Sequence, residues 1–466
     1  MTRDGEPVEI PDRHVDILLE LLAHAGQVVS KDALIEAAWK DVAVTDNSLE
    51  QAISGLRRSL EQSAGGPRYI ETLARRGYRV GVPVTRTAPR YSSEALEAML
   101  APYRAFVEGR AALETLERDA VDRARGVFED IVRASPDYSP AHVGLANALA
   151  LHFEATRAEN APDRDALARA LHHAAEACRL DPSSGEAWSV LGLASHQSRD
   201  SARAIAAAQR AAALEPDNWR HHLRLAYVSW GEQRLRPAHR ALKLFPGLAL
   251  AHWLAASVYI ARQAFTEADR ELVAGAAAQD RQHEGAKFRA VGLHLTLGLL
   301  RLSQGDESSA LQEFTRELAD EEAAHIYTRQ ARANAWCAIG AIRLRQAQPE
   351  AAVTAFERAT DVVAGHPVAI AARAAVIGDA TAKAALDGRL RELRDHGAVI
   401  EAAFAEATFN TLTGHPERAA RVLYAALEQE PAGSGGWTVP VDPLLRVNTY
   451  QEHWDAVLML LHSRAA

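Results

Sequence analysis

Apolar side chains between Val44 and Leu60 recur at the spacing of an α-helix. Leu49, Ile53, Leu56 and Leu60 lie at i, i+4, i+7 and i+11, which places them on one face. The opposite face carries amide, hydroxyl and guanidinium groups at the same spacing: Asn47, Gln51, Ser54 and Arg58. Groups of these kinds hydrogen-bond to base edges and to phosphates. The pattern predicts a helix with one buried stripe and one polar face suited to nucleic acid.

Two short strands are predicted after this helix. Gly65, Gly66 and Pro67 interrupt the helical pattern. The residues at 68–72 and 77–82 then read as strands, joined by a turn that contains two arginines. A polar-faced helix followed by an arginine-tipped hairpin is the layout of a winged helix.

Two further helices are predicted before the polar-faced one. Ser30 is expected to cap the second, which carries Leu34 and Trp39. The first is expected to end at Ala25 and Gly26. Its apolar positions are Val15, Leu18, Leu19 and Leu22.

These segments resemble the C-terminal effector domain of the OmpR/PhoB-type winged-helix regulators, in particular the CadC-like one-component branch. The resemblance covers residues 1–85 and rests on three stretches in the family's order and spacing: AGQVVSKDALIEAAW at 25–39, VTDNSLEQAISGLRRSL at 44–60 and PRYIETLARRGYRV at 67–80. It implies a transcriptional regulator that binds double-stranded DNA, with the recognition helix in the major groove and the wing at the neighbouring minor groove.

Carried over from the family, Asn47, Ser54, Gly55 and Arg57 match positions that contact DNA. The predicted DNA-binding set is completed by Ser48, Gln51, Arg58, Arg75 and Arg76. Ala52 and Gly55 stand where many relatives carry larger polar or basic side chains. We therefore expect base and phosphate contacts to depend on Gln51, Arg57 and Arg58.

The resemblance carries three further expectations. The turn at 41–44 would face RNA polymerase as well as the DNA backbone, and the domain would bind DNA as a homodimer. The family usually has several strands before its first helix, but here only residues 7–11 read as a strand. We therefore expect the coding frame to continue upstream of Met1 with further strands.

Charge is polarised along the chain. The 52 basic and 61 acidic residues give a net charge of −9, which does not indicate general nucleic-acid binding. Between Arg57 and Arg90, however, the sequence contains eight arginines and only two acidic residues, Glu61 and Glu71, which gives a local net charge of +6. An excess of this kind on one segment is typical of a surface that binds phosphates.

Composition favours a cytoplasmic protein without a membrane span. The two cysteines, Cys178 and Cys337, lie far apart within helical patterns, which suits buried positions in a reducing compartment. CadC-like relatives often carry a membrane span after the DNA-binding domain. The corresponding sequence here, TRTAPRYSSEALEAMLAPYRA, is too polar to span a bilayer.

From residue 95 to 466, after a polar linker at 86–94, the chain is expected to form tetratricopeptide (TPR) repeats, so that the whole protein is mainly α. Pro182 and Pro216 lie one 34-residue TPR period apart. Between them, Trp188, Gly192 and Ala204 occupy the large and small positions at which paired helices cross. Similar frames are found near Phe128, Gly298, Gly340 and Tyr424. Residues 442–461 are expected to form a capping helix, and 433–436 a flexible break. The alternative is a non-repetitive alanine-rich bundle.

Three aromatic residues in the repeats are candidates for a partner site. In the TPR frame Tyr227, Trp230 and Trp253 point into a concave groove, which could hold a protein or peptide. The alternative is that these rings fill the core of the solenoid, as most large aromatic side chains do.

The sequence indicates a non-enzyme without cofactor or metal. It contains no GxxxxGK[ST] phosphate-binding loop, and no receiver domain precedes the winged helix. The neighbouring histidines at 172–173 and 221–222 point about 100° apart on a helix, which suits packing better than metal binding. A second functional class remains open: a TPR scaffold whose winged helix binds protein. A protein-binding module would not need Arg75, Arg76 and Arg79 together.

Overall fold

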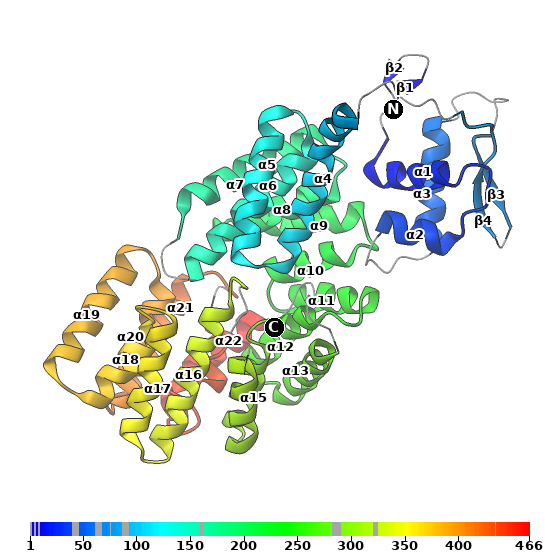
Figure 1. Ribbon diagram of the computed structural model, residues 1–466. Coiled ribbons are helices and arrows are strands. Elements are labelled where there is room, and N and C mark those ends of the chain that lie inside the picture. The colour runs from blue at the N-terminus through cyan, green and yellow to red at the C-terminus, as the bar shows by residue number, and fades with distance from the viewer. Residues whose placement is uncertain are drawn as a thin grey trace. The chain divides into compact units, whose positions relative to one another are not determined.

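The computed structural model describes residues 2–3, 6–7, 10–39, 46–60, 68–74, 76–85, 93–158, 162–281, 290–319, 325–433 and 435–466. These residues are mainly α-helical, as predicted (Figure 1). The chain divides into two compact units, and each is described by itself. One comprises residues 1–100 with 216–219, and the other comprises 101–215 with 220–466.

The N-terminal unit contains the three helices and the hairpin expected from the sequence, drawn in blue in Figure 1. Its main elements are α1 (Asp12–Ala23), α2 (Lys31–Trp39), α3 (Asp46–Leu60), β3 (Ile70–Leu73) and β4 (Gly77–Val80). In place of one strand at 7–11, a small antiparallel pair precedes α1. It is formed by β1 (Thr2–Arg3) and β2 (Glu6–Pro7). The chain before the first helix thus holds more of a sheet than the sequence indicated.

The predicted apolar stripe of α3 forms the centre of this unit's core. Leu49, Ile53 and Leu56 are each at most 1% exposed. The four apolar positions that marked α1 are not equally buried: Leu18 and Leu22 pack partly buried against the core, but Leu19 is 54% exposed. Ile17, which was not among them, is fully buried. Leu19 lies about 200° around the helix from Ile17, so the two cannot share one face. Ser30 caps α2 as predicted, accepting a hydrogen bond from the Ala33 amide at 3.2 Å.

The wing is held to the helices by backbone pairing with residue 29. Strands β3 and β4 pair antiparallel, with Ile70 opposite Val80 and Leu73 opposite Gly77. Tyr78 and Val29 exchange two backbone hydrogen bonds of 2.8 and 2.9 Å. Gly77 has a φ of +125°, and a Cβ there would lie 1.9 Å from the Val29 carbonyl oxygen. Glycine is therefore required where the wing pairs with Val29.

The second unit contains consecutive helix hairpins, the architecture of a TPR α-solenoid. In the described residues eighteen helices, α4 to α21, form nine such hairpins. Their bounds are α4 (Ser93–Thr115), α5 (Arg118–Ala134), α6 (Ser139–Ala158), α7 (Arg164–Leu180), α8 (Gly185–Gln197), α9 (Ser201–Leu214), α10 (Trp219–Val228), α11 (Glu232–Leu244), α12 (Ala249–Ala261), α13 (Phe265–Asp280), α14 (Leu293–Ser303), α15 (Glu307–Ala319), α16 (Thr328–Arg345), α17 (Pro349–Val362), α18 (Pro367–Ile377), α19 (Ala380–Asp395), α20 (Val399–Leu412) and α21 (Pro416–Gln429).

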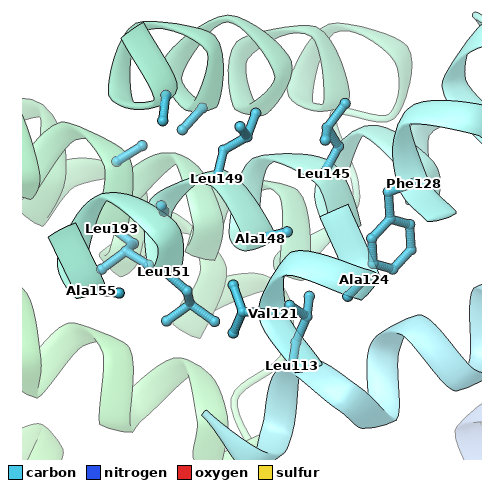
Figure 2. Close-up of a cluster of buried hydrophobic side chains, with 14 of the residues drawn as sticks. Leu113, Val121, Ala124, Phe128, Leu145, Ala148, Leu149, Leu151, Ala155 and Leu193 are labelled. Carbon is cyan, nitrogen blue, oxygen red and sulfur yellow. The ribbon is translucent and has the colours of Figure 1, made fainter. Parts of the chain in front are cut away.

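Glycines opposite phenylalanines set the close approach of paired helices. A Cβ added at Gly298 would lie 2.4 Å from the Phe314 ring, and one added at Gly340 would lie 2.4 Å from the Phe356 ring. Both pairs have the same spacing in the sequence, and both phenylalanines are fully buried. This is the small-opposite-large crossing that the repeat frame predicted. Figure 2 shows the corresponding core of the first hairpins, where Phe128 packs among alanine and leucine side chains.

Segments far apart in sequence meet within this unit. The Ile326 amide donates to the Leu116 carbonyl at 2.9 Å, so the chain before α16 lies against the junction of α4 and α5. Ile326 also belongs to the same buried cluster as Phe128. Successive hairpins therefore turn through enough of a superhelix to bring these distant segments together.

The C-terminal segment (residues 430–466) both caps the last hairpin and returns to the middle repeats. Its helix α22 (Gln451–Ala465) begins nine residues later than expected, after the 3₁₀ turn η1 (Val439–Val441). Arg446 has a φ of +49°, which is incompatible with a continuous helix from residue 442. Trp454 is fully buried against α20 and α21, while the Ala465 carbonyl accepts from Arg262 Nε at 2.7 Å, beside α12 (Figure 1).

Among the described residues, no helix is both long enough and apolar enough to cross a lipid bilayer.

Candidate nucleic-acid interface

One side of α3 is exposed to solvent. We call it the polar face, and it consists of Asn47, Gln51, Ser54 and Arg58, all of them exposed. Leu49, Ile53 and Leu56 point the other way into the core. Ser48 lies beside this face and is half-buried. The polar face is therefore held rigidly by a buried stripe on the same helix, which is what a recognition helix needs.

Positive charge accompanies the polar face. Burial lowers the pKa of His14 on α1, and the neighbouring charges of Arg58 and Arg13 lower it further. His14 is therefore neutral at pH 7, and the positive charge here comes from the arginines. At the other end of the helix, Glu50 is paired with Lys31 at 3.0 Å, which offsets its negative charge.

Two of the predicted contact residues lie between α3 and its neighbours. Arg57 donates from Nε and from a terminal nitrogen to the Ile70 carbonyl at 3.0 and 2.9 Å, and to Thr72 Oγ1 at 2.7 Å. Gly55 faces α1, where an added Cβ would lie 2.5 Å from His14 Cε1. The structure thus places the Arg57 guanidinium on the wing strand β3 and places Gly55 against α1. Neither residue belongs to the polar face.

The wing presents one exposed arginine in the described residues near its turn. Arg76 is exposed, and its amide closes the turn by donating to the Leu73 carbonyl at 2.9 Å. Arg79 instead pairs across the hairpin with Glu71 at 2.6 Å. Arg75 lies outside the described residues, as does the turn at 41–44 that was expected to face RNA polymerase.

Comparison with known proteins identifies the family to which this helix-and-wing arrangement belongs. The family model for "Transcriptional regulatory protein, C terminal" matches residues 5–80. The N-terminal unit is an OmpR/PhoB-type winged-helix domain. It is similar to the transcriptional activator CadC of Escherichia coli, with 39% identity over 85 residues, which are 18% of this chain and 17% of CadC. It is also similar to the transcriptional regulator HilA of Salmonella typhimurium, with 39% identity over 89 residues, which are 19% of this chain and 16% of HilA. The chain therefore spans about a sixth of the length of these relatives.

The remainder of the chain resembles solved helical-repeat structures. Human IFIT1, solved as a dimer with m7Gppp-AAAA, superposes with a TM-score of 0.50 at 16% identity, covering 72% of this chain and 75% of IFIT1. At this identity the likeness establishes the fold alone. Together with the helix hairpins and their glycine–phenylalanine crossings, it supports a winged helix followed by a TPR solenoid.

The three aromatic residues predicted to form a partner groove all lie partly buried in the second unit. The Trp253 indole donates to Thr296 Oγ1 at 3.0 Å. The Trp230 ring lies under the Arg234 guanidinium, 4.6 Å from its centroid. Tyr227 contacts the His196 ring edge-on at 5.5 Å between centroids. Each ring therefore already has protein neighbours on at least one side.

The chain's own C-terminal segment covers two of these rings. Trp437 packs edge-on against Trp253, with ring centroids 5.4 Å apart and planes at 88°. Gly433 approaches Trp230 so closely that a Cβ there would lie 2.8 Å from ring atom Cγ. Sequence reasoning missed this contact because the glycines at 433–436 suggested a flexible break. The tryptophan directly after them was the signal of a docked segment.

Among the residues that the structure describes, no group of three or more histidine, cysteine or carboxylate side chains is arranged to hold a metal ion.

Proposed function

We propose that this chain is a sequence-specific transcriptional regulator that reads promoter DNA with the polar face of α3 and contacts the flanking phosphates through its wing. The observation that supports this best is the exposure of Asn47, Gln51, Ser54 and Arg58 on a helix whose opposite side is fixed in the core. The family match over the same residues supports the same proposal.

The proposed roles of the predicted residues differ. Gln51 carries an amide that can bond both edge groups of an adenine in the major groove. Arg58 and Arg76 are exposed cations suited to phosphates. Arg57 and Gly55 are proposed to act indirectly, because their contacts hold α3 against the wing and against α1.

The TPR solenoid is proposed to sense a signal or to recruit a protein or peptide partner. A partner that uses Trp230 and Trp253 has to displace Gly433 and Trp437 from them. From the composition of the chain we also propose a cytoplasmic location. From the family resemblance we propose binding as a homodimer and a contact with RNA polymerase.

The test begins by selecting a preferred duplex from a random pool with the full-length protein. Fluorescence anisotropy then measures the affinity of variants for that duplex over a range of salt concentrations. Arg58→Ala and Arg76→Ala should each lower the salt slope by about one and weaken binding to every sequence alike. Gln51→Ala should relax the preference at one base pair, at a cost of about 1–3 kcal/mol.

A matched control is Arg133→Ala, which removes another exposed arginine, this one from the repeats. It should leave both affinity and salt slope unchanged. Absence of duplex binding at low salt would contradict the proposal. Retained partner binding in that case would favour the alternative, a scaffold whose winged helix contacts protein.

A further inference from the structure

A buried carboxylate in the repeats is bonded by polar groups from two helices and a connecting segment. Glu154 on α6 is 3% exposed. It pairs with Arg157 at 2.7 Å and accepts from Gln197 Nε2 on α8 at 3.2 Å. The Tyr327 hydroxyl, 173 positions later, donates to it at 3.1 Å. Because Arg157 donates to both carboxylate oxygens, Glu154 accepts four hydrogen bonds in all, and Arg157 is the one charge that offsets its own.

Tyr227 on α10 extends this cluster toward a second arginine. Its hydroxyl adjoins that of Tyr327, and burial raises the pKa of both phenols, so both stay protonated at neutral pH. Burial, together with the nearby arginine charges, also lowers the pKa of His196, which packs edge-on against Tyr227. The cluster thus supplies neutral hydrogen-bonding groups, but it supplies no carboxylate beyond Glu154.

Arg224 lies one helical turn before Tyr227, on the same face of α10. Burial lowers its pKa, and the groups that interact with its charge are the phenols of Tyr227 and Tyr327. Its side chain nevertheless keeps part of its exposure to solvent. Within the described part of the chain it makes no hydrogen bond or ion pair. The Arg224 guanidinium is thus surrounded by protein and still reached by water, but it has no hydrogen-bonding partner among the described residues. This is unusual, because such groups normally pair with carboxylates.

Arg234 adds a second charge without a counter-ion. It is 7% exposed, and it donates to neutral acceptors only: the carbonyls of Ala226, Ser229 and Tyr227 and the hydroxyl of Ser257. Burial lowers its pKa to about 10, so it remains protonated at pH 7. The charges of Arg157 and Glu154 cancel, which leaves the positive charges of Arg224 and Arg234 uncompensated in the cluster. Of these two, only the Arg224 guanidinium makes no hydrogen bond to the described residues.

We propose that this cluster is a binding site for a small oxyanion, the carboxylate or phosphate group of a small-molecule ligand, held by Arg224 beside Tyr227 and Tyr327. The oxyanion would supply the acceptors that the guanidinium lacks, and the fixed charge of Arg234 would favour it further. The inference deepens the proposed sensing role, because the site joins α10 to the segment before α16. A ligand there would stabilise that long-range contact.

The test uses the full chain, without DNA, at constant ionic strength. Thermal unfolding is followed while sodium chloride is replaced by sodium phosphate in one arm and by sodium benzoate in the other. We expect a saturable rise in Tm in at least one arm, from which an apparent Kd is obtained. A rise with phosphate alone assigns a phosphate group to the ligand, and a rise with benzoate alone assigns a carboxylate.

Arg224→Gln should weaken the apparent Kd by about ten- to hundredfold, the usual worth of a charge-assisted hydrogen bond. Arg133→Gln, which removes an exposed arginine from the same unit, should leave it unchanged. If Arg224→Gln does not fold, Arg224→Lys decides, and a loss of about threefold or more is expected because lysine lacks the planar fork. No saturable rise in either arm, or an unchanged Kd in the deciding variant, overturns the proposal. Since the assay contains no DNA, its failure is distinct from a failure of DNA binding.

Discussion

Replacing Arg57 by alanine tests which of two roles this residue has: positioning the recognition helix or contacting DNA. The family pattern predicts that Arg57 contacts DNA, whereas its guanidinium lies on β3. If that placement persists in the complex, Arg57→Ala should loosen the wing against α3. It should weaken DNA binding through that loosening and not through a lost phosphate contact.

The magnitude follows from the contacts. The guanidinium makes three hydrogen bonds to two acceptors, the Ile70 carbonyl and Thr72 Oγ1. Hydrogen bonds from charged donors contribute about 1.5–3 kcal/mol each when buried, and less where solvent competes. Because the Thr72 contact is exposed, we expect a total loss of about 2 kcal/mol. This corresponds to roughly thirtyfold more frequent opening of the wing.

Hydrogen exchange measures that opening directly. Amides of residues 70–80 should exchange about thirtyfold faster in Arg57→Ala than in the unmodified protein. Arg58→Ala should leave their exchange unchanged and lower the salt slope of DNA binding by about one. The reasoning is refuted if Arg57→Ala exchanges at the original rate while its salt slope falls as much as that of Arg58→Ala.

Two further predictions concern the C-terminal segment. Burial raises the pKa of Asp442 from 3.8 to about 6. The folded state therefore binds this proton more tightly than the unfolded state, and it loses stability as pH rises from about 4 to about 6. The total loss above pH 6 is about 3 kcal/mol. Asp442→Asn, which keeps an acceptor for the Leu444 amide, should therefore raise Tm at pH 8 and leave it unchanged near pH 4; equal effects at both values would contradict this. Trp437→Ala should cost about 2 kcal/mol in thermal or urea unfolding, because it removes the ring packed on Trp253. Met459→Ala, at a residue that is 66% exposed, should change stability by less than about 0.5 kcal/mol, and similar losses in both variants would contradict docking of the segment.

Local pattern by itself determined most of the N-terminal unit and the repeat architecture. The spacing of Leu49, Ile53 and Leu56 identified the buried face of α3, and therefore the exposed one, because a helix fixes the direction of every side chain relative to its neighbours. The positions of Gly340 and Phe356 indicated a helix crossing for a similar reason. In α1 the apolar positions marked the helix but did not identify its buried face, because leucines lie on more than one side of it: Leu19 is exposed and Ile17 is buried.

Only the tertiary structure decided which groups the long side chains contact and which distant segments of the chain pack together. Nothing near Arg57 in the sequence shows that its guanidinium reaches β3, since an arginine on the edge of a polar face can turn toward either solvent or protein. The bond from Tyr327 to Glu154 spans 173 positions, and the packing of Trp437 on Trp253 joins the C-terminal segment to α12. These contacts depend on how much the solenoid turns at each repeat. That rotation is the sum of many small packing angles, and no periodicity within one repeat encodes the sum.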